Sequence, residues 1–282
     1  MTSNLMTSFK TYLRAALAIM LGERCVVCGR PLIGQGICPR CLLELPYINI
    51  RGVAGNCIER LFWGQVPVER ASATIVYQPG FSVEILLHAI KYRNRPDLAI
   101  EMGRMMAQEH LASGFFDGID AIQPIPLHPR RQRERGYNQS ERLAQGISEV
   151  TGLPILDFVQ RVIDNVSQTH LSHDERRQNV YNIFKVTDAE HAMPASAETA
   201  STTAISRPLH LLLIDDVITT GSTTISCAKT LNEKMPDLRL SFLSFAYAGQ
   251  RNVGRFFPSD HGLPDCTVAN TDFRERQYRP LA

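Results

Sequence analysis

The sequence lacks a long hydrophobic run and lacks an excess of charge of either sign. No stretch of about 18 apolar residues, the length that spans a bilayer, occurs among the 282 residues, so we expect no transmembrane helix. Lys and Arg number 30 and Asp and Glu number 28, which leaves a net charge of +2. That charge is too small to indicate nucleic-acid binding by itself, so any basic surface must come from local clustering.

A cleavage site of small residues is also missing after the apolar stretch TYLRAALAIML, which Arg14 interrupts. We therefore expect no signal peptide. Apolar residues recur in this stretch at helical spacing, which predicts an amphipathic helix over residues 1–22 that packs on its own domain or lies on a membrane surface. Without a secretory signal, the seven cysteines indicate a reducing compartment, and we expect a cytoplasmic protein.

Four of the cysteines form two C-x-x-C pairs within CVVCGRPLIGQGICPRC: Cys25, Cys28, Cys38 and Cys41. Two such turns can direct four thiolates at one tetrahedral Zn²⁺ ion, which predicts a four-cysteine zinc-ribbon module over residues 23–48. Four sulfur ligands leave the metal no open position, so the zinc would be structural. A redox pair or disulfides in a small domain remain the alternative. The isolated residues Cys57, Cys227 and Cys266 are expected to be ordinary thiols.

Residues 49–69 mix Pro, Gly and polar residues without a sustained period, which predicts a linker. From residue 70 to 282 apolar segments alternate with helical patterns. The segment LHLLLIDDV is apolar without alternation, as expected of a strand covered on both faces. We therefore predict an α/β domain with a mostly parallel central sheet. Residues 187–208 are rich in Ala, Ser and Thr, and this composition predicts a mobile surface insertion.

The segment LLLIDDVITTGST ends a predicted strand, residues 209–214, with Asp215 and Asp216. In parallel sheets, ligands bind at the carboxyl ends of strands. The loop that follows would offer N–H groups, hydroxyls and a helix N-terminus to an anion, and Gly221 would let the backbone approach a phosphate. Carboxylates are suited to accept from the hydroxyls of a sugar diol. A phosphate-binding loop beside acceptors for a diol favours a sugar phosphate as the ligand. The segment contains neither the P-loop motif G-x-x-x-x-G-K-[ST] nor the Rossmann motif G-x-G-x-x-G.

This segment resembles the phosphoribosyl pyrophosphate (PRPP) signature of type I phosphoribosyltransferases. The resemblance implies a type I phosphoribosyltransferase-like fold in which Asp215 and Asp216 form the catalytic pair, holding the ribose hydroxyls while Mg²⁺ bridges to the pyrophosphate. It also implies that five residues hold the 5′-phosphate: Thr219, Thr220, Gly221, Ser222 and Thr223.

A second block, PIPLHPRRQRERGYNQ, follows a short predicted strand and concentrates positive charge in His128, Arg130, Arg131, Arg133 and Arg135. A dense positive field of this kind indicates contacts with pyrophosphate or with a nucleic-acid backbone, and a solvated charged turn is the alternative. The segment 167–184 adds two histidines and two arginines, and either a functional role or an ordinary charged loop fits it.

The cysteine pairs, together with AIKYRNRPDLA, RERGYNQ, QTHLS and DDVITTGST, resemble the ComF family of competence proteins. That resemblance implies a zinc module in front of a phosphoribosyltransferase-like domain. It further implies that residues 128–136, with Arg131, Arg133 and Arg135, form a loop on the pyrophosphate side and that residues 167–179 form a flexible hood over the site. Lys91 and Arg93 would be further phosphate contacts or part of a helix surface.

Two functions follow from these patterns. The first is a PRPP-binding protein of DNA uptake that handles single-stranded DNA with other competence proteins, with Tyr137 either stacking on a base or packing in the core. The alternative is an active phosphoribosyltransferase that passes the phosphoribosyl group to a nitrogen acceptor, for which the sequence offers no base-specificity segment. Thr2 follows Met1, where a glutamine amidotransferase would need its nucleophile, so we do not expect that activity.

Overall fold

The computed structural model describes residues 22, 24–32, 36–48, 50, 52–163, 183–187 and 207–249. The expected N-terminal helix, the basic segment 167–179, most of the 187–208 insertion and the residues after 249 lie outside this described part. Among the described helices, none is long and apolar enough to cross a membrane.

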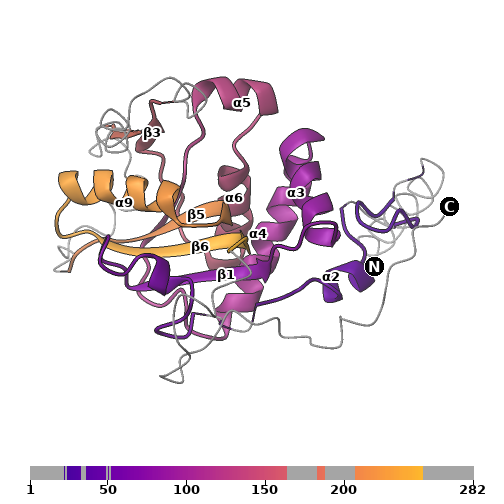
Figure 1. Ribbon diagram of the computed structural model, residues 1–282, viewed down its shortest axis with the longest axis horizontal. Helices are drawn as coiled ribbons and strands as arrows, with labels where there is room; N and C mark the ends of the chain where they lie inside the picture. Colours follow the sequence, from indigo (N-terminus) through magenta and orange to yellow (C-terminus); the bar gives the residue numbers. More distant parts are fainter. Residues whose placement is uncertain are drawn as a thin grey trace, which may run out of the picture.

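The central element is a sheet of four parallel strands in the order β1-β6-β5-β2 (Figure 1). The strands are β1 (Arg70–Val76), β2 (Ala121–Pro124), β5 (His210–Ile218) and β6 (Arg239–Tyr247). Strands β5 and β6 are buried almost throughout, which is why their sequences are continuously apolar rather than alternating. The predicted α/β fold with a parallel sheet is confirmed.

Six α-helices and one 3-10 helix accompany the sheet in the described part of the chain. They are α2 (Pro39–Leu43), α3 (Ser82–Tyr92), α4 (Pro96–Leu111), α5 (Pro129–Arg135), α6 (Gln139–Thr151) and α9 (Ser222–Lys234), with a short 3-10 helix η1 (Glu59–Leu61). Pro96 opens α4, and Gly152 ends α6 with a left-handed φ of 75°. A small antiparallel pair, β3 (Val159–Arg161) with β4 (Phe184–Val186), lies outside the main sheet.

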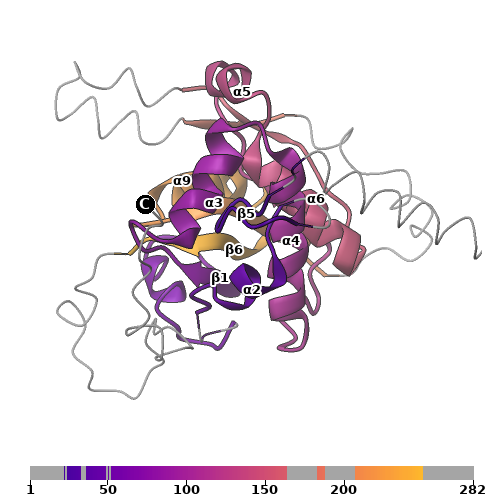
Figure 2. The same ribbon diagram turned by 90° about the vertical axis from the view of Figure 1, so that its right-hand side faces the viewer.

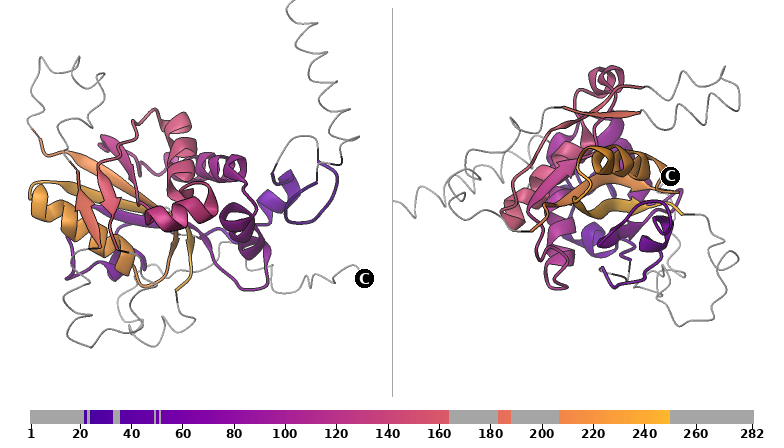
Figure 3. Two further views of the ribbon diagram at one scale, coloured as in Figure 1. Left: turned by 90° about the horizontal axis from the view of Figure 1, so that it is seen from above. Right: turned by 90° about the vertical axis from the view of Figure 1, so that its left-hand side faces the viewer.

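Helices cover both faces of the sheet. On one face α3, α4 and α6 bury their apolar residues against Leu212, Ile214 and Leu243. On the other face α9 and the β3–β4 pair pack against Leu211, Leu213 and Phe242. Figures 1 and 3 show α9 lying along β5 and β6.

Helices α4 and α6 meet at two glycines. A Cβ atom on Gly146 would lie 2.0 Å from the carbonyl oxygen of Ile100, and one on Gly103 would lie 2.1 Å from the carbonyl oxygen of Leu143. Both neighbours are backbone atoms, so no side-chain rotation could relieve the clash. The two helices therefore approach backbone to backbone, and only glycine fits at this crossing.

The predicted linker, residues 49–69, is not an exposed connection. Ile50, Ile58 and Phe62 are buried in the core on the α9 side of the sheet, and the ring of Phe62 stacks on Phe242 with centroids 4.4 Å apart. The scattered apolar residues of this segment each reach the core from an irregular backbone, so they show no regular period along the sequence.

The cysteine module is joined to the domain by direct packing. Cys25, Ile37 and Cys41 share one hydrophobic core with α3 and α4. Gly36 lies against the carboxylate of Glu101 on α4, and the hydroxyl of Tyr47 lies 3.4 Å from the sulfur of Met105. Figure 2, which views the molecule from the module's side, shows α2 beside α4.

Candidate functional site

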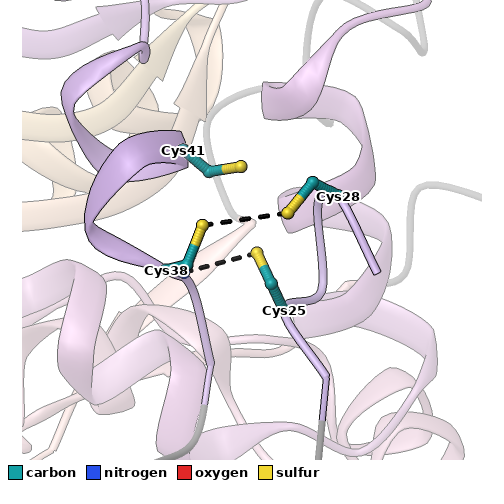
Figure 4. A group of neighbouring side chains, drawn as sticks. All are labelled: Cys25, Cys28, Cys38 and Cys41. Atoms are coloured by element: carbon teal, nitrogen blue, oxygen red, sulfur yellow. Dashed lines mark hydrogen bonds between the residues drawn. The ribbon is translucent and has the colours of Figure 1, made fainter. Parts of the chain in front are cut away.

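The four cysteines of the two C-x-x-C pairs converge on one point, and their sulfur atoms all lie within 4.8 Å of one another (Figure 4). Cys38 and Cys41 come from the start of α2, and Cys25 and Cys28 come from the turn that precedes it. The sulfurs of Cys28 and Cys38 are 3.8 Å apart. Sulfurs bound to one tetrahedral Zn²⁺ ion are also about 3.8 Å apart. The four cysteines could therefore hold a metal ion such as zinc.

Backbone N–H groups around Cys25 favour its thiolate form. Burial acts to raise the pKa of this thiol, but N–H groups of Cys28, Cys38 and Val27 lower it to about 7. The amide of Cys38 donates to the sulfur of Cys25 at 3.3 Å. This arrangement suits a metal ligand, since metals bind the thiolate rather than the thiol.

The other two described cysteines differ from each other. Cys227 on α9 is fully buried, and burial together with the charge of Asp215 raises the pKa of its thiol, as expected of an inert core cysteine. The prediction of a free thiol at Cys57 is wrong, because Cys57 is disulfide-bonded. Its partner lies outside the described residues.

The second site lies at a switch point of the sheet. Strands β2 and β5 are neighbours, but α6, which follows β2, covers one face, while α9, which follows β5, covers the other. Open α/β sheets bind ligands at such a divergence, outside the carboxyl ends of the strands. Asp215 and Asp216 lie at this end of β5.

The acidic pair lies within the strand and not beyond it. The predicted strand end at residue 214 is wrong, because β5 continues to Ile218 and Asp215 is paired in register with Ser244 of β6. The ladder persists because Val217 and Ile218 still pair with β6. The two carboxylates are consequently held by the sheet.

The two carboxylates have different surroundings. Asp215 accepts from the backbone N–H of Asp216 at 2.8 Å and from the hydroxyl of Ser140, the second residue of α6, at 3.4 Å. Burial and the charge of Asp216 raise the pKa of Asp215 to about 7, although the Asp216 N–H, Lys91 and Ser140 act in the opposite direction. Asp216 instead pairs with Lys91, whose Nζ lies 2.8 Å from its Oδ2.

The hydroxyl-rich loop directly follows the acidic pair. Thr219, Thr220 and Ser222 are exposed, and the hydroxyls of Thr220 and Ser222 lie 3.0 Å apart. Gly221 has a φ of 75° and precedes α9, which no side chain caps. The first N–H groups of α9 therefore lie next to the loop hydroxyls along the chain, and a phosphate is the ligand type that such a helix start accepts.

The arginine block forms a helix and not the predicted loop. Pro129 opens α5, the ring of His128 accepts from the N–H of Arg130, and Gly136 ends the helix with a φ of 81°. Arg133 is exposed, Arg131 is partly buried, and Arg135 donates to Gln139 at 2.8 Å. The guanidinium of Arg135 also lies 5.7 Å from the ring centroid of Tyr92, the residue that follows Lys91.

Tyr137 packs in the core, which answers the alternative left open by the sequence. Its side chain is 5% exposed, and its hydroxyl donates to the carbonyl of Ile90 on α3. Tyr92, by contrast, is 66% exposed. The aromatic side chain that the arginines accompany at the surface is therefore Tyr92.

Sequence reasoning missed Ser140 and the partner of Lys91. Ser140 stands in a helix whose start is marked by Asn138, but nothing in the sequence indicates contact with a residue 75 positions away. Lys91 was expected to bind phosphate or to lie on a helix surface, and it instead contacts Asp216.

Comparison with known proteins gives relatives over most of the chain. The chain is 29% identical over 223 residues to the DNA utilization protein YhgH of Salmonella typhimurium, covering 77% of this chain and 88% of that protein. It is 28% identical to competence protein F of Haemophilus influenzae, covering 78% and 89%. It is 26% identical to competence protein ComFC of Bacillus subtilis, covering 78% and 76%. No family model matches the chain.

Among solved structures, the chain is similar to a glutamine PRPP amidotransferase from B. subtilis, with a TM-score of 0.34 and 18% identity over 55% of this chain and 30% of that one. It is also similar to the adenine phosphoribosyltransferase of Saccharomyces cerevisiae, with a TM-score of 0.32 and 12% identity. That match covers 56% of this chain and 72% of the yeast chain. Likeness at this level carries no conclusion, so the class of the protein rests on its own sheet and signature.

The parallel sheet and its switch point define an α/β domain joined to a four-cysteine module, and the signature on β5 resembles that of type I phosphoribosyltransferases. The relatives that match over most of the chain are more specific than the fold. This chain is a relative of the ComF-type competence proteins and of the DNA utilization proteins, which confirms the resemblance found in its motifs.

Proposed function

We propose that this chain is a PRPP-binding protein of the ComF type that acts in DNA uptake. The observation that carries the proposal is the placing of Asp215 and Asp216 at the switch point, next to the exposed hydroxyl loop and the start of α9. In this proposal the two carboxylates hold the ribose hydroxyls, and residues 219–223 hold the 5′-phosphate. The names of the relatives, which refer to competence and DNA utilization, support the role in DNA uptake.

Magnesium fits the same pair. Mg²⁺ prefers oxygen ligands and is usually held by one or two carboxylates together with substrate phosphates, and Asp215 and Asp216 could supply the carboxylates. The bound ion would neutralise charge on the pyrophosphate group. The side chains would meanwhile orient the sugar.

Calorimetric titration with PRPP and Mg²⁺ tests the proposal. The wild-type chain is expected to give binding heat, and a chain with Asp215→Asn and Asp216→Asn is expected to bind about tenfold to a hundredfold more weakly, because each change removes a charged acceptor. Asp237→Asn, an exposed change in the turn before β6, is the matched control and is expected to bind like the wild type. Absence of heat from the wild type would refute the proposal.

Catalysis is a second candidate function, and the raised pKa of Asp215 favours it. Carboxyl groups with strongly shifted pKa values are concentrated at active sites. The reaction would be transfer of the phosphoribosyl group to a nitrogen acceptor with release of pyrophosphate. Pyrophosphate release from PRPP in the presence of candidate bases distinguishes the two functions, because a binding protein releases none.

Single-stranded DNA is the partner that the surface around α5 favours. Tyr92 is exposed at the end of α3, with Arg93 beside it and Arg135 over its ring, and Arg131 and Arg133 extend along α5. Clustered arginines bind backbone phosphates, and an exposed aromatic ring can stack on an unpaired base. We propose this α3–α5 surface, rather than Tyr137, as the stacking platform.

Binding of an oligothymidylate of about 12 nucleotides tests this surface. Tyr92→Ala is expected to weaken binding about tenfold without changing its salt dependence, since stacking is lost and no charge is removed. A chain with Arg131→Ala and Arg133→Ala is expected to lower the slope of log K against log salt by about 2. Trp63→Ala, which removes another exposed aromatic ring, is the control. Equal affinity of the Tyr92→Ala and Trp63→Ala chains would contradict the assignment.

A further inference from the structure

Lys91 occupies an unusual place for a lysine in a sugar-phosphate site, because its ammonium group lies on the acidic pair. Its Nζ is 2.8 Å from the Oδ2 of Asp216, and the two side chains are only 21% and 15% exposed. Ion pairs at the open surface contribute little, because water and salt screen them. This pair is partly withdrawn from water, so its charges act on one another more strongly.

The fold fixes the position of Lys91 from several directions. Lys91 lies in the last turn of α3, where the helix dipole favours a positive charge. The buried Tyr137 donates to the carbonyl of Ile90, the preceding residue. The turn after the helix is also specialised: Asn94 has a φ of 49°, and a Cβ on Gly136 would lie 3.6 Å from its Oδ1. The helix end that carries Lys91 is thus held by packing on both sides.

The chemistry of the ammonium group suits a sugar phosphate. A lysine side chain is a compact charge with three donors, and Asp216 is its one described ion-pair partner. Other donors of Lys91 can face hydroxyl or phosphoryl oxygens of a ligand while the pair stays intact. In other phosphoryl-binding sites a divalent ion provides this positive charge between carboxylate and ligand.

We propose that Lys91 is a positioning residue of the sugar site: its contact with Oδ2 holds the Asp216 carboxylate aimed at the sugar hydroxyls, so that a ribose phosphate binds without a divalent metal. The inference rests on the proposed function and adds the ligand class that the site accepts, a phosphorylated pentose that brings no diphosphate and no metal. Mg²⁺ then serves the pyrophosphate group of PRPP and is not needed to hold the ribose.

Titration of the full chain with ribose 5-phosphate, in EDTA and again in Mg²⁺, tests the inference. The wild type is expected to bind equally in both buffers. Lys91→Met is expected to bind at least about tenfold more weakly in EDTA, because a charge-assisted contact is lost. Mg²⁺ should restore part of that loss, and Lys91→Arg should retain most of the affinity. Restoration by an added cation is a response that a purely structural role of Lys91 would not give.

Lys234→Met is the matched control, because Lys234 also lies in the last turn of its helix, α9. It should bind ribose 5-phosphate like the wild type. If the wild type binds ribose 5-phosphate only with Mg²⁺, or if Lys91→Met binds as tightly as the wild type in EDTA, the inference is overturned. The wild-type comparison needs no variant, so it holds even where Lys91→Met folds poorly.

PRPP with Mg²⁺ is titrated in parallel to separate the two proposals. A wild type that binds PRPP with Mg²⁺ but binds ribose 5-phosphate only with the metal refutes the role of Lys91 and leaves the proposed function standing. A wild type that binds neither compound under any condition refutes the proposed function, and the inference with it.

Discussion

Replacing Cys41 by serine is expected to abolish zinc binding and to destabilise the whole chain. Cys41 is buried in the same hydrophobic core as Cys25, Ile37 and the helices α3 and α4. The free energy of metal binding is available for folding, so its loss should lower the free energy of unfolding by about 3 kcal/mol or more. Metal content of the purified chain and thermal unfolding, followed by circular dichroism, measure the two effects.

Arg40→Ala provides the control for this experiment. Arg40 lies in the same short helix, is exposed, and forms an ion pair with Glu44 that contributes little stability. It should retain about one zinc ion per chain, since each of the four sulfurs stays in place. A Cys41→Ser chain that keeps its metal, or a wild type without any, would show that the four sulfurs do not form the site.

Gly146→Ala is expected to destabilise the chain although alanine favours helices. The intrinsic gain is about 1 kcal/mol. The added Cβ would lie 2.0 Å from the carbonyl oxygen of Ile100 and 2.7 Å from the amide nitrogen of Arg104, so α4 and α6 must move apart. Overpacking of this kind costs about 1–3 kcal/mol and more where backbone is involved, so we expect a net loss of about 2 kcal/mol or more. Urea unfolding measures it.

Gln145→Ala, at the neighbouring position of α6, separates the clash from effects of helix propensity. Gln145 is partly exposed and should change the free energy of unfolding by less than about 0.5 kcal/mol. If Gly146→Ala proves as stable as the wild type, the two helices do not meet backbone to backbone, and the packing described for α4 and α6 is wrong.

The sequence predicted those features that depend on nearby residues. Two C-x-x-C turns define the cysteine cluster because each turn brings its own pair of thiols together. The run of apolar residues through Ile214 defines a strand buried on both faces, and Gly152 defines the end of α6. The loop of residues 219–223 is likewise local, since its hydroxyls and its glycine are contiguous.

Two local predictions were wrong. The strand was expected to end at residue 214, before Asp215 and Asp216, but Val217 and Ile218 continue the ladder with β6. The family resemblance implied a loop over the arginine block. Pro129 at its start and Gly136 at its end are helix signals that the sequence already contained.

Contacts between segments that are distant in the chain could not be predicted from the sequence. Lys91 and Asp216 are brought together by the packing of α3 against the sheet, and no periodicity indicates such a pair. The roles of Tyr92 and Tyr137 depend on which ring faces solvent. Arginines lie near both in the sequence, so the sequence does not distinguish the exposed ring from the buried one. A single sequence specifies neither, because burial is decided by the elements that meet in space.

The extension of β5 past the acidic pair gives the two acids a different backbone setting from the hydroxyl loop. Asp215 and Asp216 are anchored on a ladder that continues for two more residues, so their carboxylates have little freedom to follow a ligand. Thr219 and Thr220 lie just beyond that anchor and are exposed. If the site binds a sugar phosphate as proposed, adaptation to ligands of different size therefore falls on the hydroxyl loop, while the acids keep their positions.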